Sequence, residues 1–308
     1  IGVRDNEIIV PTNTFIATAN SIIRAGGKPI FADIDPLTLA ISIKSIKECI
    51  TNRTKGIIIV HMFGIMSPEI GYIQDICHEN GLFFLEDAAH AHGANYKGSS
   101  AGNLGIAGCF SYYVSKILAT GEGGAVTTNN EELANKIHSL KNRGLADDGI
   151  RFDHAGNNFR LAEIPALLGI YQHKRLPEIL KNRRAISKIY RNILSSSELL
   201  KVIDPTPHNG HSYWRYPILL DNSIDRSRIQ KIMAEQYSTR ITWMYEPLCH
   251  EQPFYSNKIK LKSALPNSIN IINNLINLPT HTGINQNAAK YIASGLITTI
   301  EEEIPKCK

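Results

Sequence analysis

The chain has 308 residues, of which 43% are hydrophobic, enough to bury a full core in one large and one small domain. The formal net charge of +5 is mild, and the densest basic stretch, "KNRRAISK", fits a solvated helix face, which argues against a nucleic-acid partner. Five cysteines without paired spacing argue against a disulfide framework or a zinc site and favour a reducing, cytoplasmic compartment. No apolar run approaches the roughly 20 residues that span a bilayer, so we expect no membrane partner.

From residue 7 to about residue 129, short β-rich runs alternate with helical stretches. Runs such as "IIIV" and "LFFL" are apolar on both faces, as expected of central strands that helices cover on each side. The alternation predicts an α/β fold with a parallel or mixed sheet. The predicted strands are residues 7–11, 28–35, 55–64, 82–87, 108–113 and 123–128, and the predicted helices are residues 14–26, 42–50 and 69–81.

From about residue 131 to residue 197 the pattern is mostly helical, with Pro165 predicted to mark a helix start and Pro177 a kink or break. The stretch that follows is rich in Ser, Pro, Asn and Gly, which predicts a domain boundary there. The second unit is predicted to be a small α+β domain. Its predicted elements are strands at residues 213–220 and 240–245, a helix at residues 226–237 and a closing helix at about residues 286–304.

Two side chains at predicted strand ends suggest a shared crevice. Asp87 ends the run "LFFLED", and Lys116 follows the next strand-like run, "GCFSYY". Ligands of open α/β sheets collect at the carboxyl ends of strands. A carboxylate and an amine there suit pyridoxal phosphate, because the amine forms a Schiff base with the aldehyde while the carboxylate keeps the pyridine nitrogen protonated. On spacing alone, an Asp–Lys salt bridge or two separate surface charges are the favoured alternatives.

Several stretches in a fixed order carry a resemblance that covers nearly the whole chain. They are "EIIVPTNTFIATANSIIRAGGKPIFADIDP", "VHMFG", "LEDAAHAHGANYKG", "GCFSYYVSKILATGEGGAV", "GNNFRLAEIPALLGI" and, more loosely, "EPLCHEQPFY" and "NLPTH". With these stretches the chain resembles the DegT/DnrJ/StrS family of sugar aminotransferases, which are pyridoxal-phosphate enzymes of fold type I. The resemblance implies a three-layer α/β large domain that binds the cofactor at residues 1–197, and a smaller C-terminal α+β domain at residues 198–308.

The resemblance assigns roles to four residues around the cofactor. Lys116 would form the Schiff base and then move the proton between the donor's α-carbon and the cofactor's C4′, and Asp87 would pair with the pyridinium. Phe15 matches the aromatic residue that stacks on the cofactor ring, with ordinary core packing as the alternative. His90 matches the position near the cofactor's ring hydroxyl. A metal role for His90 with His92 receives little weight, because no carboxylate or cysteine cluster joins them, and we predict no metal site.

Three more residues are assigned in the same way. Ser111 matches a hydroxyl that binds the cofactor phosphate, and Asn158 matches an asparagine that reaches this phosphate from the other subunit of a homodimer. Arg160 matches a position facing the substrate's anionic diphosphate, although an arginine at a helix entry is more often only solvated. The following helical stretch has an apolar stripe that suits either its own domain core or a second subunit. Its members are Leu161, Ile164, Leu167, Leu168 and Tyr171.

The resemblance implies transfer of an amino group, with glutamate as the expected donor, to a nucleotide-linked keto-deoxysugar in surface polysaccharide or glycoside biosynthesis. A related dehydratase branch carries histidine in place of the lysine, so Lys116 favours transamination. Family members begin with a helical segment and a Ser-Gly-Thr stretch that cradles the phosphate, whereas this chain starts at the strand before "VPTNTF". The alternative hypothesis is therefore a truncated, catalytically weak or silent member with a structural or regulatory role.

Overall fold

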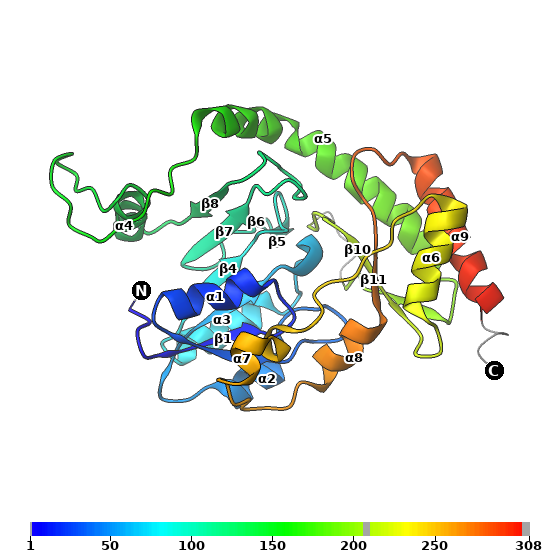
Figure 1. Ribbon diagram of the computed structural model, residues 1–308, viewed down its shortest axis with the longest axis horizontal. Helices are drawn as coiled ribbons and strands as arrows, with labels where there is room; N and C mark the ends of the chain where they lie inside the picture. The colour runs from blue at the N-terminus through cyan, green and yellow to red at the C-terminus, as the bar shows by residue number, and fades with distance from the viewer. Residues whose placement is uncertain (1, 206–209, 304–308) are drawn as a thin grey trace.

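A computed structural model describes residues 2–205 and 210–303, and its N-terminal part is built on a six-stranded, mostly parallel sheet (Figure 1). The strand order is β2-β1-β3-β4-β7-β8, and each neighbouring pair is parallel except β7 with β8. The predicted α/β sheet is therefore confirmed. The strands are β1 (Glu7–Pro11), β2 (Lys28–Ala32), β3 (Thr54–Val60), β4 (Phe83–Asp87), β7 (Ala107–Ser111) and β8 (Gly124–Thr127).

Helices cover both faces of this sheet, because successive side chains along its central strands point in opposite directions and both sets are apolar. Ile8 and Val10 of β1 pack with the first helix, whereas Ile9 between them packs with the next two helices on the opposite face. The result is three layers: helix, sheet and helix. The three helices are α1 (Ile16–Arg24), α2 (Ile43–Cys49) and α3 (Ile70–Glu79).

A second, antiparallel sheet of order β11-β10-β9 forms the core of the C-terminal part. Its apolar cluster includes Tyr216 and Ile218 of the middle strand and Leu296 of the closing helix, all fully buried. This arrangement confirms the predicted α+β character of the C-terminal unit. Its elements are β9 (Leu200–Val202), β10 (Tyr216–Leu220), α6 (Arg226–Tyr237), β11 (Leu275–Leu278) and α9 (Gln286–Glu303).

One long helix, α5 (Glu163–Leu194), runs from beside the large sheet into the C-terminal part (Figure 1). Pro165 is its third residue, where a missing N–H costs no intrahelical bond. Pro177 lies inside α5 and does not break it. The lost hydrogen bond and ring clash, worth about 3 kcal/mol, are offset by the burial of residues such as Ile186 and Tyr190 in the C-terminal core. α5 precedes residue 197 in the chain, yet its last turns pack in the C-terminal core. The predicted boundary between two domains after residue 197 therefore stays a prediction.

The strand predicted at residues 240–245 is wrong. In this segment only Thr242 makes a β-type pair, an isolated bridge with Asn277 of β11, which is an outer strand of the small sheet. The chain then leaves the small sheet, and Tyr245 packs near the carboxyl edge of the large one, where its hydroxyl lies 3.3 Å from His90 Nε2. The predicted boundary stretch falls partly on residues 206–209, which lie outside the described residues.

The remaining elements are short, apart from α4 in the loop that leads to α5. In the described ranges, no helix combines the length and apolar character needed to cross a membrane. These elements are η1 (Met62–Gly64), β5 (Asn95–Tyr96), β6 (Ser99–Ser100), α4 (Glu131–Lys141), η2 (Cys249–Glu251), α7 (Pro253–Ser256) and α8 (Pro266–Asn274).

Candidate active site

The carboxyl ends of β1, β3, β4 and β7 meet at one edge of the large sheet, because these strands are parallel. Asp87 is the last residue of β4, and its Cα is in register with Cys109 of the neighbouring β7. The chain leaves β7 at Ser111 and enters the loop that carries Lys116. The topology therefore brings the two predicted catalytic residues to adjacent strand ends.

Two hydrogen bonds fix the carboxylate of Asp87. Thr18 on α1 donates its hydroxyl to Oδ2 at 2.6 Å, and the N–H of Ala89 donates to Oδ1 at 3.1 Å. A carboxylate has about four acceptor sites, so each oxygen can still accept a further donor. The two hydrogen bonds therefore fix the orientation of the Asp87 carboxylate and leave it free to accept further hydrogen bonds.

The neighbouring Glu86 points to the opposite side of β4 and has a different role. Its side chain is fully buried and accepts backbone N–H groups from Gly102, Leu104 and Gly105, while His61 Nε2 lies 2.8 Å from Oε2. Hydrogen bonds from these partners outweigh the desolvation and lower the pKa of Glu86. The alternation along β4 thus makes Glu86 a structural anion and directs Asp87 to the other side of the strand, toward Thr18 on α1.

Lys116 is a half-buried amine against an aromatic ring. Its Nζ lies 4.4 Å from the ring centroid of Trp214, whose indole N–H donates to the carbonyl of Ser115 at 2.5 Å. Burial lowers the pKa of Lys116 from 10.5 to about 8, against the opposing charge of Asp87 and with a further lowering by Arg215. At pH 7 about a tenth of the amine is therefore neutral and nucleophilic, far more than for a lysine with the ordinary pKa of 10.5.

His90 is buried beside this lysine. Its ring stacks on Trp214 at a centroid separation of 3.9 Å. The N–H of Phe63 donates to Nδ1 at 3.3 Å, which places the proton of a neutral ring on Nε2, facing the Tyr245 hydroxyl at 3.3 Å. Burial holds the pKa of His90 well below its usual value, with Lys116 lowering it further, so the ring is neutral.

Phe15 stands at the entrance to α1 with 54% of its surface exposed. Its ring centroid lies 5.5 Å from that of Tyr245. The side chain lies outside the apolar cores, so it offers an open aromatic face near the group formed by Asp87 and His90.

The other three predicted residues have hydrogen-bond partners outside this group. The Ser111 hydroxyl, at the end of β7, accepts the N–H of Tyr113 at 3.3 Å. Asn158 and Arg160 are both exposed, and Arg160 Nε donates to Asn158 Oδ1 at 2.9 Å. Among the described residues, no hydrogen bond or ion pair connects Asn158 or Arg160 to Lys116 or Asp87.

Three residues at the site were not predicted from the sequence. Trp214 and Arg215 precede β10, inside a run that the sequence marks only as a strand. Tyr245 lies in the segment wrongly predicted as a strand. Because all three approach from the C-terminal part of the chain, local patterns carried no signal of their proximity to Lys116.

Comparisons with known proteins find relatives in both sequence and fold. A GDP-perosamine synthase of Vibrio cholerae is 31% identical over 293 residues, covering 94% of this chain and 78% of that protein. The spore coat polysaccharide biosynthesis protein SpsC of Bacillus subtilis (strain 168) is 33% identical over 293 residues, covering 90% and 74%. The solved structure of Helicobacter pylori PseC, an aminotransferase of pseudoaminic acid biosynthesis, superposes with a TM-score of 0.90 at 28% identity, covering 98% and 81%.

PseC is an aminotransferase, and the architecture that it shares with this chain is the fold of pyridoxal-phosphate-dependent transferases. The sequence pattern of one family matches residues 1–297, which include every predicted site residue. The chain therefore belongs to the DegT/DnrJ/EryC1/StrS aminotransferase family.

Proposed function

We propose that this chain is a pyridoxal-phosphate-dependent aminotransferase that transfers an amino group from glutamate to a nucleotide-linked keto-deoxysugar, for surface polysaccharide or glycoside synthesis. The observation that carries the proposal is the half-buried amine of Lys116, with its lowered pKa, across from the oriented carboxylate of Asp87. The GDP-perosamine synthase among the relatives, whose name specifies a nucleotide-linked sugar, supports the substrate class.

The side chains present fit pyridoxal phosphate. An aldehyde needs a neutral amine, which the lowered pKa of Lys116 supplies. A pyridine nitrogen that must stay protonated needs a fixed carboxylate with acceptor capacity to spare, which Asp87 offers. The exposed ring of Phe15 offers a stacking face, and Ser111 offers a hydroxyl for the phosphate. When bound, the cofactor supplies an electron sink for the carbanion at the donor's α-carbon.

In this proposal each side chain has one task. Lys116 holds the cofactor and then moves a proton between the donor's α-carbon and the cofactor's C4′. Asp87 accepts the hydrogen bond of the pyridinium N–H and keeps that proton in place. His90, neutral and protonated on Nε2, supports the ring hydroxyl side of the site together with Tyr245. Arg160 faces the anionic part of the sugar nucleotide.

The test of this function is a panel of nucleotide-linked 3-keto and 4-keto deoxysugars incubated with glutamate and the purified protein. We expect formation of 2-oxoglutarate with at least one sugar, and none when the sugar is omitted. Failure with every sugar, in protein shown to hold the cofactor, would contradict the substrate class.

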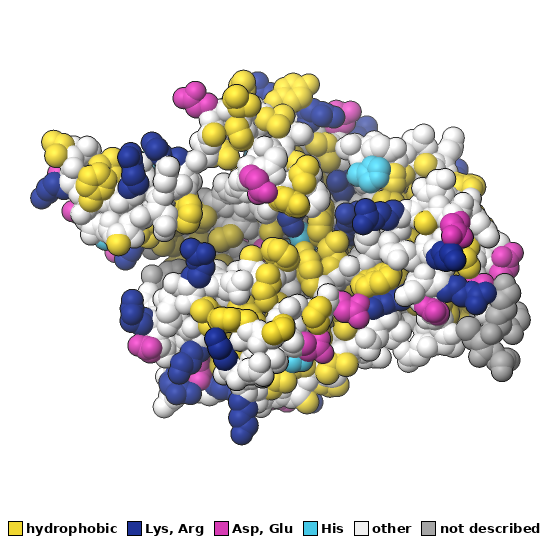
Figure 2. All heavy atoms as spheres, viewed as in Figure 1, with side chains coloured by type: hydrophobic (Ala, Val, Ile, Leu, Met, Phe, Trp, Pro, Cys, Tyr) yellow, Lys and Arg dark blue, Asp and Glu magenta, His cyan; other side chains and the backbone are white. Residues whose placement is uncertain are grey.

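We also propose a homodimer with the site at its interface. The N-terminal half of α5 exposes a broad apolar stripe, with Ile164 at 84% and Leu167 at 69% exposure. Figure 2 shows apolar side chains gathered over this end of the helix. All five residues of the predicted stripe are exposed in the single chain, which favours a second subunit over packing within its own domain. In such a dimer Asn158 would reach the partner's cofactor phosphate.

Leu167→Asp is expected to convert the dimer into a monomer. The substitution removes about 1.5–3 kcal/mol of apolar burial per copy and places a charge in the interface. The dissociation constant of the dimer should therefore rise at least a hundredfold. Light scattering after size exclusion measures the change. Lys188→Asp, at an exposed position near the other end of α5, is the control and should stay dimeric. A dimeric Leu167→Asp protein would exclude this face as the interface.

The reactivity of Lys116 should rise with pH around 8. Its pKa is lowered from 10.5 to about 8, so the neutral amine increases as the pH passes through 8 and is already dominant near pH 9. Labelling with an amine reagent at a series of pH values, read from the Lys116 peptide by mass spectrometry, measures this curve. A midpoint at the ordinary lysine value would show that burial does not perturb the amine.

A cytoplasmic location is the remaining part of the proposal. Cys49, Cys77, Cys109 and Cys249 are free thiols in the described part of the chain, which fits a reducing compartment.

A further inference from the structure

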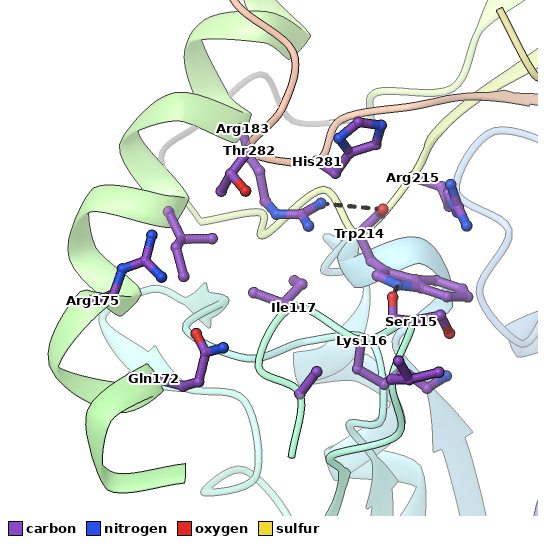
Figure 3. A pocket seen from close by; sticks show the side chains of 13 residues that line it. Ser115, Lys116, Ile117, Gln172, Arg175, Arg183, Trp214, Arg215, His281 and Thr282 are labelled. Atoms are coloured by element: carbon purple, nitrogen blue, oxygen red, sulfur yellow. Dashed lines mark hydrogen bonds between the residues drawn. The ribbon is translucent and has the colours of Figure 1, made fainter. Parts of the chain in front are cut away.

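A cleft of about 560 Å³ lies at the other end of the large sheet from Asp87. It includes Glu7 and Lys28, the first residues of the parallel strands β1 and β2, whereas Asp87 is the last residue of β4. Among the described residues, none lines both this cleft and the cavity of about 340 Å³ beside Lys116, whose arginines and histidine Figure 3 shows. The cleft is therefore separate from the candidate active site.

One part of the cleft wall is apolar. Its apolar residues are Ile23, Pro29, Ile30, Ile259 and Leu261. Ile23 and Ile259 are partly buried and pack against the apolar cluster that contains Ile8 and Val10, while Leu261 is 38% exposed. Ligand pockets combine such apolar walls with a few polar groups, at volumes of ~300–1,000 Å³. The cleft therefore has the size and the walls to hold the apolar body of a small molecule.

The rest of the lining is mostly basic. Its cations are Lys28, Arg53, Lys258, Lys260 and Lys262, and a single acid accompanies them. In the stretch "KIKLK", Ile259 and Leu261 each lie between two lysines. Lys28, Lys258 and Lys260 are exposed and form no ion pair within the described ranges. This one-sided set of cations beside an apolar wall favours a negatively charged occupant.

The acid of the cleft, Glu7, is already neutralised. Its buried carboxylate accepts Arg53 Nη2 on Oε1 at 2.7 Å and Lys262 Nζ on Oε2 at 2.6 Å. Burial opposes its ionisation, but hydrogen bonds from Lys262, Thr51 and Arg53 prevail and lower the pKa of Glu7. Arg53 and Lys262 each have further N–H groups, so both can still donate to a second anion.

We propose that this cleft binds a phosphate monoester with a short apolar body. The hydrocarbon part would lie against Ile259 and Leu261, and the phosphate would accept hydrogen bonds from Lys28, Lys260 and Arg53. A phosphate monoester carries about 1.5–2 negative charges at pH 7 and three acceptor oxygens. It therefore complements several cations better than a single carboxylate does. This binding goes beyond the proposed function and does not depend on it.

The test measures binding of octyl phosphate to the 308-residue chain by isothermal titration calorimetry, below the concentration at which the probe forms micelles. We expect saturable binding of one molecule per chain. Inorganic phosphate lacks the apolar body, octanol lacks the charge, and octanoate carries only one negative charge. Each of these three compounds should bind at least about tenfold more weakly than octyl phosphate.

Lys260→Gln and Leu261→Asn test the two parts of the site. Both positions are exposed, so the substitutions should leave the fold intact. Each should weaken octyl phosphate binding about tenfold, the value of one charge-assisted hydrogen bond or of the apolar contact of one leucine side chain. Lys290→Gln, at an exposed position on α9 that does not line the cleft, is the matched control and should bind like the unchanged protein.

Four results would overturn the proposal. Octyl phosphate might not bind the unchanged protein, or it might bind either cleft variant with full affinity. Inorganic phosphate, octanol or octanoate might bind as tightly as octyl phosphate, which would remove the requirement for both parts of the ligand. Equal weakening in Lys290→Gln would assign the binding to the overall positive charge of the chain. Covalent attachment of pyridoxal phosphate to Lys116, measured separately, bears on the proposed function alone.

Discussion

Lys116→Ala is expected to abolish the covalent attachment of pyridoxal phosphate and with it all transaminase turnover. Alanine has no amine, and proton transfer by a positioned base is itself worth about 10²–10⁴ in rate. After incubation with the cofactor and reduction by borohydride, the unchanged protein should carry the cofactor on the Lys116 peptide. Mass spectrometry should find no cofactor on the variant.

Lys55→Ala and Lys97→Ala are the controls. Both lysines are exposed, Lys55 at the start of β3 and Lys97 in the turn between β5 and β6. These variants should attach the cofactor normally. If the Lys116→Ala protein still gave a reducible yellow adduct, the assignment of Lys116 would be wrong.

The large sheet was predictable because each of its central strands has a recognisable pattern in its own short stretch of sequence. A run such as "IIIV" in β3 is apolar on both faces, and this pattern arises where helices cover both sides of a sheet. The prediction failed at residues 240–245 because a local pattern typical of a strand occurs there without a strand. Its alternating apolar residues are typical of a strand, but they are used for tertiary contacts, as the packing of Tyr245 against Phe15 and His90 shows.

The site was predictable only where its residues follow strands of the parallel sheet. Asp87 and Lys116 could be paired because the carboxyl ends of β4 and β7 meet by topology. Trp214 and Arg215 are distant in sequence and approach through the packing of the C-terminal part, which no periodicity encodes. The same holds for the cavity beside Lys116, since its cations come from α5 and from the segments before β10 and after β11.

Asp87→Asn is expected to lower turnover at least about a hundredfold, the usual cost of losing one preorganised electrostatic contact, while changing the free energy of unfolding by no more than about 2 kcal/mol. An amide cannot keep the pyridine nitrogen protonated, so the electron sink weakens. The volume is nearly unchanged, and the amide oxygen can still accept from Thr18 or from the N–H of Ala89. Steady-state kinetics and urea denaturation measure the two effects.

Glu86→Gln is the matched control, because it makes the same acid-to-amide change one residue earlier on β4 and on the opposite side of the strand. Glu86 accepts three backbone N–H groups and meets His61, and its side chain is fully buried. An amide keeps only one acceptor oxygen, so at least one buried donor loses its partner, at about 1–3 kcal/mol each. We therefore expect the reverse result: a clear loss of stability, with turnover per folded molecule largely retained. Near-normal turnover in Asp87→Asn would show that Asp87, like Glu86, is a structural carboxylate and that the cofactor binds elsewhere.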